Sequence, residues 1–158
     1  MTVRVQTEDF DAGAEIARLR AGNPKVGAVA AFIGVARDIN DGSRVATLSL
    51  EHYPGMTEKA LQQIVVEAYA RWRVIDALVI HRVGSLKPAE QIVLVAVASE
   101  HWGDAFQACE FIMDYLKTRA PFWKKETTPE GARWVEARAD DDAAAACWRA
   151  PNVKADVG

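Results

Sequence analysis

Two spacing patterns of apolar residues alternate along this chain, and this alternation constrains the fold more than any other feature of the sequence. Between residues 57 and 72 apolar side chains recur every three to four positions, which predicts an amphipathic helix capped by Thr57. A similar pattern at residues 103–118 predicts a second long helix, which Pro121 prevents from continuing. A shorter helix is expected from an Asp11 cap to about Arg20. The apolar stripe expected in the helix at 103–118 consists of Phe106, Cys109, Ile112, Met113 and Leu116.

Short runs rich in β-branched and aromatic residues separate these helices and predict strands. The expected strands are Val3–Gln6, Val26–Val35, Val45–Tyr53, Ala77–Val83, Ile92–Ser99, Phe122–Thr127 and Arg133–Ala137. The run at 26–35 is almost entirely apolar, which predicts a strand covered on both faces. Turn residues predict that 26–35 pairs with 45–53, 77–83 with 92–99, and 122–127 with 133–137 as hairpins. With an alanine-rich helix at 140–148, the pattern predicts an α+β sandwich with a mostly antiparallel sheet.

Length and charge narrow the class of protein. A chain of 158 residues with 50% hydrophobic residues is expected to form one domain over residues 1–150, followed by a flexible tail at 151–158. The sequence shows no leader and no apolar run long enough to cross a bilayer, so a cytoplasmic protein that does not bind membranes is expected. The net charge of −3 argues against nucleic acid as a partner. Cys109 and Cys147 lack metal-ligand spacing, so neither a metal nor a cofactor is expected.

Polar residues at the ends of predicted elements are the candidates for chemistry. Arg37 follows a strand and opens a glycine-containing loop, where its guanidinium can fork onto a phosphate. His101 and Trp102 precede a helix, where unpaired backbone N–H groups attract anions. His52 lies at a strand-to-helix corner. An exposed arginine or a structural histidine explains each of these positions equally well without any function.

A group of lysines around Pro121 is more informative. Lys117 ends the predicted helix at 103–118, and Lys124, Lys125 and Glu126 begin the strand that follows Pro121. The helix dipole by itself favours a cation at Lys117, but it does not explain Lys124. Because strand side chains alternate, Lys124 and Glu126 share one face, and only one of Lys124 and Lys125 can face the same pocket as Lys117. A pair of nearby lysines can include one with a lowered pKa, which suits proton transfer near neutral pH.

Five ordered blocks of residues resemble the catalytic (large) subunit family of molybdopterin synthase. The blocks run Phe32–Arg37, Leu50–Leu61, His81–Gly84, Met113–Lys117 and Ala120–Glu126, and the resemblance extends from about Gly27 to Trp148. It implies an α/β hammerhead-type sandwich with an added antiparallel subdomain. It also implies a homodimer core of a heterotetramer, with a small ubiquitin-like sulfur-carrier subunit at each end. Two molecules of that partner, each with a C-terminal Gly-Gly thiocarboxylate, would give one sulfur each to cyclic pyranopterin monophosphate.

The resemblance also implies roles for particular residues. Lys117 and Lys124 match catalytic lysines of the family. The substrate-binding positions it implies are Val35, Ala36, Arg37, His101, Trp102, Lys117, Lys124, Lys125 and Glu126. Trp102 stands where the family usually has an arginine, which removes a bidentate phosphate donor, and Arg138 or Arg119 are candidates for the replacement charge. The residues alone leave two other functions open, a phosphohydrolase or other transferase and a phosphate-binding module without catalysis.

Overall fold

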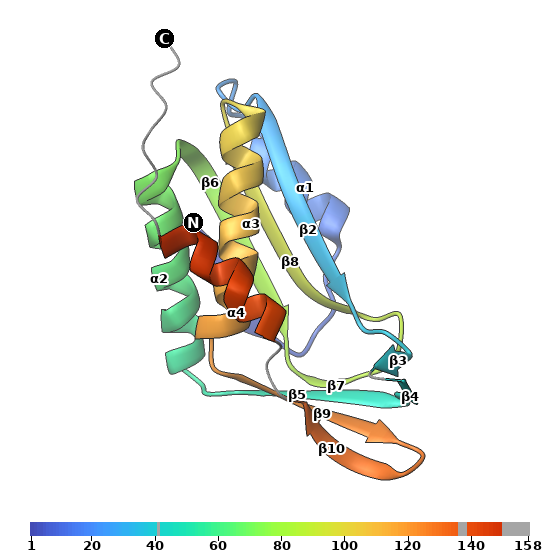
Figure 1. Ribbon diagram of the computed structural model, residues 1–158. Helices are drawn as coiled ribbons and strands as arrows, with labels where there is room; N and C mark the ends of the chain where they lie inside the picture. Colours follow the sequence, from blue (N-terminus) through green and yellow to red (C-terminus); the bar gives the residue numbers. More distant parts are fainter. Residues whose placement is uncertain (41, 136–138, 150–158) are drawn as a thin grey trace.

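The computed structural model describes residues 1–40, 42–135 and 139–149 (Figure 1). Its strands are β1 (Thr2–Gln6), β2 (Ala28–Val35), β3 (Ile39–Asn40), β4 (Ser43–Arg44), β5 (Thr47–His52), β6 (Val74–Arg82), β7 (Gly84–Leu86), β8 (Gln91–Ser99), β9 (Phe122–Thr128) and β10 (Gly131–Val135). Its helices are α1 (Ala12–Arg20), α2 (Met56–Arg71), α3 (Trp102–Arg119) and α4 (Ala139–Ala146), followed by a 3₁₀ turn at Cys147–Arg149. The predicted mixed fold with mostly antiparallel sheets is confirmed.

The first sheet has the strand order β1-β6-β8-β2 and lies between helices (Figure 1). The predicted hairpin of β6 and β8 forms its centre, and β1 adds to β6 in parallel. Alternate residues of β6 face opposite layers: Leu78 and Ile80 pack toward α1, whereas Ala77 and Val79 pack toward α2 and α3. This alternation places His81, the next residue in the second series, on the α2 and α3 side.

The second sheet has the order β10-β9-β5-β7 and lies below the first in Figure 1. β9 pairs with β10 as the predicted hairpin and with β5 on its other side, so that Lys124 lies opposite Leu50 and Phe122 lies opposite His52. β3 and β4 form a separate two-stranded sheet. Two residues of the strand expected at 133–137 lie outside the described residues, and so does the expected tail at 151–158.

The predicted hairpin between 26–35 and 45–53 is wrong. β2 pairs only with β8, whereas β5 pairs with β7 and β9 in the second sheet. The turn residues of the intervening loop close the small β3–β4 hairpin instead. Local turn chemistry therefore marked a real reversal of the chain, but it could not decide which strands the reversal joins.

Two expectations of burial also fail. β2 is an edge strand, with Phe32 and Ile33 each 41% exposed and Val35 46% exposed, so it is not covered on both faces. On α3 the predicted stripe is buried except at Phe106, which is 62% exposed and packs edge-on against Trp102. An apolar residue at helical spacing is buried only if another element covers that side of the helix.

Helix starts follow local chemistry closely. Asp11 caps α1 by accepting the N–H of Ala14, as predicted. α2 begins one position before the predicted Thr57 cap, because Gly55 adopts a positive φ of 84° as N-cap and donates its N–H to Glu58. Thr57 itself is fully buried inside the first turn.

The predicted C-terminal helix is present as α4. The 3₁₀ turn after it places the Trp148 ring edge-on against Trp72 and Phe111, and the Trp148 indole N–H donates to Asp114. The Arg71 guanidinium donates to the Trp148 carbonyl. These contacts hold α4 against α3. Among the described residues, no helix is long and apolar enough to span a membrane.

Candidate functional site

Lys117 lies in the last turn of α3, where the structure brings it to α4. Its Nζ is 3.4 Å from a carboxylate oxygen of Asp141, and its side chain is 45% exposed. The C-terminal end of a helix is a favourable position for a cationic side chain. The amine is held by one solvent-accessible ion pair, so a stronger anion can compete for it.

Lys124 lies near the start of β9, beside an aromatic stack of the buried His81 and the half-buried Phe122. The rings of His81 and Phe122 are 3.8 Å apart at their centroids and inclined by 18°. His81 is the last residue but one of β6 in the first sheet, and Phe122 begins β9 of the second, so this stack joins the two sheets. Because Phe122 and Lys124 lie two apart in one strand, the stack and the Lys124 side chain occupy the same face of β9.

The electrostatic environment of His81 is unusual for a residue so close to Lys124. Burial lowers its pKa to about 4, the carbonyl of Arg82 acts in the opposite direction, and the charges of Lys124 and His52 lower the pKa further. The Arg82 carbonyl lies 2.8 Å from His81 Nδ1 and can only accept, so Nδ1 carries the hydrogen. His81 is therefore a neutral ring next to a cation.

In addition to the stack of His81 on Phe122, a contact from α2 holds the segment between the two lysines. Thr57 donates its hydroxyl to the Pro121 carbonyl at 3.0 Å and accepts the backbone N–H of Tyr53 at 3.0 Å. Thr57 thus ties the end of β5 to the residue before Phe122. His52, on β5, lies 3.6 Å from Glu58 and completes the polar surroundings of this corner.

Lys125 and Glu126 are both predicted to bind substrate, and in the structure their side chains contact other residues of the protein. The Lys125 ammonium lies 5.5 Å from the centroid of the Trp134 ring. Glu126 is 5% exposed, accepts from Arg133 at 3.0 and 3.1 Å and accepts from Asn40 at 2.5 Å. This carboxylate joins β9 to β10 and to the β3–β4 hairpin.

The residues at the end of β2 divide into exposed and buried positions. Val35 and Arg37 are exposed, and between them Ala36 is buried and exchanges backbone hydrogen bonds with Ala89 and Glu90. Within the described ranges no carboxylate lies within ion-pair distance of Arg37. Figure 1 shows that β2 and α3 both end at the same end of the first sheet. Lys117 lies in the last turn of α3 and is therefore at this end.

His101 and Trp102 lie at the other end of α3. His101 is its exposed N-cap, and Trp102, 73% exposed, is its first residue. A rise of 1.5 Å per residue along this helix places His101 about 24 Å from Lys117. The C-terminal end of α3, the start of β9 and the end of β2 lie at the same end of the fold (Figure 1). Lys117 lies in the last turn of α3, Lys124 lies in β9 and Arg37 follows β2, whereas His101 and Trp102 lie at the opposite end of α3.

Comparison with known proteins adds independent evidence. The model of the family described as "MoaE protein" matches residues 5–119. The chain is 70% identical over 147 residues to the molybdopterin synthase catalytic subunit of Ralstonia nicotianae, covering 93% of this chain and 84% of that protein. The chain belongs to the MoaE protein family. The family predicted from the sequence is thereby confirmed.

Solved structures of MoaE proteins share this fold. The molybdopterin biosynthesis MoaE protein from Burkholderia ambifaria is 62% identical, with a TM-score of 0.80 and coverage of 93% of this chain and 97% of that one. A complex of subunits 1 and 2 of molybdopterin-converting factor from Helicobacter pylori gives a TM-score of 0.71 with coverage of 86% and 91%. At 17% identity the second likeness concerns the fold alone.

Arg119, one of the two candidates for a replacement charge near Trp102, is paired elsewhere. The Arg119 guanidinium bonds both carboxylate oxygens of Glu67 at 2.9 and 3.0 Å and lies 3.9 Å from the centroid of the Tyr115 ring. Arg138 lies outside the described residues. Arg119 lies in the last turn of α3, at the opposite end of this helix from Trp102.

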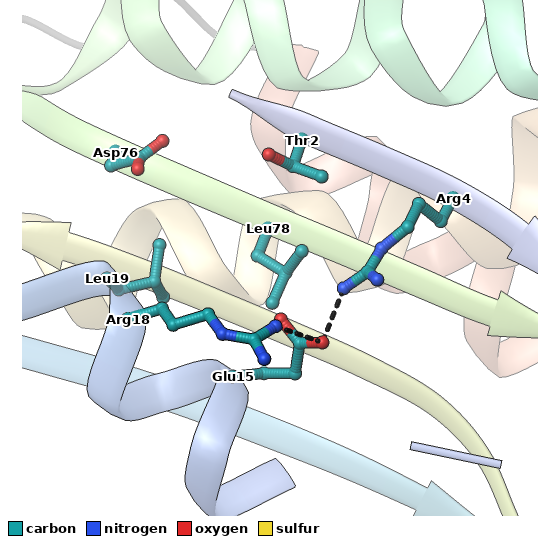
Figure 2. Close-up of a pocket in the computed structure, with 7 residues that line it drawn as sticks. All are labelled: Thr2, Arg4, Glu15, Arg18, Leu19, Asp76 and Leu78. Carbon is teal, nitrogen blue, oxygen red and sulfur yellow. Dashed lines mark hydrogen bonds and ion pairs between the residues drawn. The ribbon is translucent and has the colours of Figure 1, made fainter. Parts of the chain in front are cut away.

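A hollow of about 280 Å³ lies on the opposite face of the first sheet, between α1 and the strands β1 and β6 (Figure 2). Its two arginines, Arg4 and Arg18, both reach Glu15, at 2.6 and 3.2 Å. The hollow is lined by these two arginines and by two carboxylates, Glu15 and Asp76, so the charges of its lining offset one another. The lysine end of the fold is the better candidate.

Sequence reasoning missed His81, Phe122 and Thr57 as parts of the site. All three lie within blocks that resemble the MoaE family, but their separation along the chain gave no reason to place them together. The alternation of β6 could have shown that His81 is buried. Only the packing of the two sheets shows that its neighbour is Phe122.

Proposed function

We propose that this chain is the catalytic subunit of a molybdopterin synthase, which converts cyclic pyranopterin monophosphate to molybdopterin with sulfur from the thiocarboxylate of a small ubiquitin-like subunit. The observation that carries the proposal is the pair of exposed lysines on either side of a segment held by Thr57 and His81. Fixed cations suit a reaction in which negative charge develops as a cyclic phosphate opens. The relative from Ralstonia nicotianae bears the same functional name.

The sulfur must come from outside this chain. Burial raises the pKa of the Cys109 thiol to about 11, so this cysteine is not a thiolate near neutral pH. Cys147 lies on the 3₁₀ turn, where its thiol faces the carbonyl of Ala143. A partner with a Gly-Gly tail fits this need, since a chain without side chains can enter a narrow channel and present a terminal sulfur.

Each residue of the proposed site has a different role in the reaction. The partner's thiocarboxylate sulfur attacks the pterin side chain, and the cyclic phosphate opens. Water then cleaves the resulting thioester, so that the sulfur stays on the pterin and the partner leaves as a carboxylate. A second partner molecule supplies the second sulfur in the same way. Lys117 stabilises the developing charge or passes a proton, with Lys124 assisting. Arg37 binds phosphate, and Val35, Ala36, Lys125 and Glu126 shape the adjoining wall.

His101 and Trp102 complete the site only from a second copy of the chain. They lie about 24 Å from Lys117 along α3, too far to contact the same small substrate. A homodimer core, with a small subunit at each end, resolves this separation. The exposed apolar edge of β2 offers a surface that a second copy could cover.

Each copy is proposed to fold as a single domain over residues 1–150. β7 belongs to the second sheet but lies between β6 and β8 of the first sheet along the chain. Neither sheet can therefore be cut away without breaking the other.

Incubation with cyclic pyranopterin monophosphate, with and without thiocarboxylated small subunit, tests the function. Product that forms only with the partner supports the synthase. Turnover without the partner would indicate a phosphohydrolase, and tight binding without turnover in both arms would indicate a binding module.

The assignment of Arg37 has its own test. Arg37→Ala should weaken substrate affinity, because a guanidinium that forks onto phosphate is lost. Calorimetric titration with the cyclic phosphate measures this directly, with Arg44→Ala as a matched control on the same hairpin region. An unchanged affinity together with a collapsed chemical step would contradict the assigned role.

A further inference from the structure

We propose that His81 and Phe122 form a stacked positioning pair that sets the location of Lys124 relative to Lys117. The proposal rests on the proposed function for its catalytic consequence, and it assigns a role to two residues that do not themselves carry the chemistry.

The geometry begins with the path of the chain between the lysines. From Lys117 the chain completes α3, turns at Ala120 and Pro121, and enters β9 at Phe122. Besides the pairing of β9 with β5, two side-chain contacts from outside this segment hold it: the Thr57 hydroxyl donates to the Pro121 carbonyl, and the His81 ring stacks on the Phe122 ring. The position of β9 relative to α3 therefore depends on α2 and on β6 as well as on β5.

The stack is built to be rigid on its His81 side. His81 is 4% exposed, lies within the register of β6 between Val5 of β1 and Val93 of β8, and donates Nδ1–H to the Arg82 carbonyl. A ring fixed by two strands and a hydrogen bond provides a fixed surface for Phe122. Because Lys124 lies two residues further along β9 on the same face, the position of Phe122 also determines the position of Lys124.

A neutral ring suits this place better than a charged one. The cationic or titratable groups that act on His81 are Lys124 from β9 and His52 from β5, and both oppose its protonation. Arg82, next in β6, turns away and donates to the Thr7 and Gln91 carbonyls. His81 can thus contact the lysine strand closely without adding a repelling charge.

Two substitutions separate the ring from the hydrogen bond. His81→Phe keeps a flat ring and loses the donor to Arg82, whereas His81→Asn keeps a donor and loses the ring. We expect single-turnover sulfur transfer to stay close to wild type in His81→Phe and to fall about 10- to 100-fold in His81→Asn, the size expected for a misplaced catalytic group. Phe122→Leu, which removes the other ring, should match His81→Asn.

A double-mutant cycle shows whether the effect passes through Lys124. In a Lys124→Ala background, His81→Asn should cause no further loss of rate. The same fold-loss in both backgrounds, at temperatures where every variant is folded, would show a general structural role and overturn the proposal. Wild-type rates in both His81→Asn and Phe122→Leu would overturn it as well.

A second readout does not depend on sulfur transfer. Acetylation by an N-hydroxysuccinimide ester, quantified by peptide mass spectrometry, gives the reactivity of Lys124 relative to the exposed Lys125 of the same strand. That ratio should change in His81→Asn and Phe122→Leu and remain at the wild-type value in His81→Phe. An unchanged ratio in all variants overturns the proposal. A wild-type enzyme that labels as expected but never forms product contradicts the proposed function instead.

Discussion

At the scale of single residues, the charged side chains of β9 differ in burial and in their contacts although they are close in sequence. Glu126 is buried among Arg133 and Asn40 and joins three strands. Lys124 lies on the same face of the strand, but it is exposed and close to His81. Burial therefore separates a structural carboxylate from a solvent-accessible amine two positions away.

Replacement of either proposed catalytic lysine should remove activity while the fold persists. Lys117→Ala and Lys124→Ala should lower the single-turnover rate about 10²- to 10⁴-fold. Both side chains are exposed, so the free energy of unfolding should change by only about 0.5 kcal/mol. Lys117→Arg should not restore the rate, because a guanidinium does not readily release a proton.

Quenched-flow conversion with preloaded thiocarboxylated partner, alongside chemical denaturation, measures both effects of the lysine substitutions. Lys87→Ala, in the β7–β8 turn, is the matched control for loss of a surface lysine. Near-normal conversion in an alanine variant, or a loss that merely follows unfolding, would remove that lysine from the mechanism.

Stability should depend on pH through His81. Its pKa is lowered from 6.5 to about 4 in the folded chain, so the unfolded chain binds the proton more tightly. The stabilisation is fully present above about pH 6.5 and is lost as the pH falls toward 4, by on the order of 3 kcal/mol. Urea denaturation across this range should show a shallower loss for His81→Phe than for wild type. Parallel slopes would mean that His81 does not remain neutral on folding.

At the scale of elements, the first turn of α2 connects the end of β5 to the start of β9. Thr57 is buried and joins the end of β5 to the entry of β9 through one hydroxyl. Gly55 and Glu58 start the helix instead of Thr57, which leaves the threonine side chain available for this connection. Helix capping and sheet positioning are thus divided among adjacent residues.

Thr57→Val should be destabilising although it preserves the shape of the side chain. The Pro121 carbonyl and the Tyr53 N–H would both lose their partner, at a cost on the order of 2 kcal/mol or more. Thr57→Ser, which keeps the hydroxyl, is the matched control and should be much milder. Denaturant midpoints compare the three proteins, and equal midpoints for valine and threonine would show that water replaces the hydroxyl.

At the scale of the whole molecule, the length of α3 separates two groups of proposed binding residues. Lys117 and Arg37 lie at one end of the fold, and His101 and Trp102 lie at the other (Figure 1). The exposed edge of β2 runs between the two ends. A two-fold arrangement of chains can bring the far end of one copy to the near end of another.

Mixing two impaired variants should restore part of the activity. In a dimer of one Lys117→Ala chain and one His101→Ala chain, one of the two shared sites has both native residues. Random reassortment should therefore restore about a quarter of the wild-type rate at low substrate concentration. Light scattering should show a dimer that gains mass with the small subunit. A strictly monomeric protein, or mixtures no more active than their components, would contradict the shared site.

The sequence by itself determined the local structure: the helices, most strands, two of the three long hairpins and the mixed fold class. These features depend on spacing, caps and turn residues that lie within a few positions of one another. The resemblance of five short blocks was enough to indicate the family, which the comparisons confirm. Lys117 and Lys124 were candidates because Pro121 separates a helix end from a strand start.

Only the tertiary structure decided which surfaces meet. The sequence placed β2 in a hairpin and under cover on both faces, whereas packing made it an exposed edge and gave β5 to another sheet. The same packing placed His81 against Phe122 and the Thr57 hydroxyl against Pro121, across separations of 41 and 64 positions. Spacing along a chain records which face a side chain takes, but its partner is fixed by how the finished layers stack.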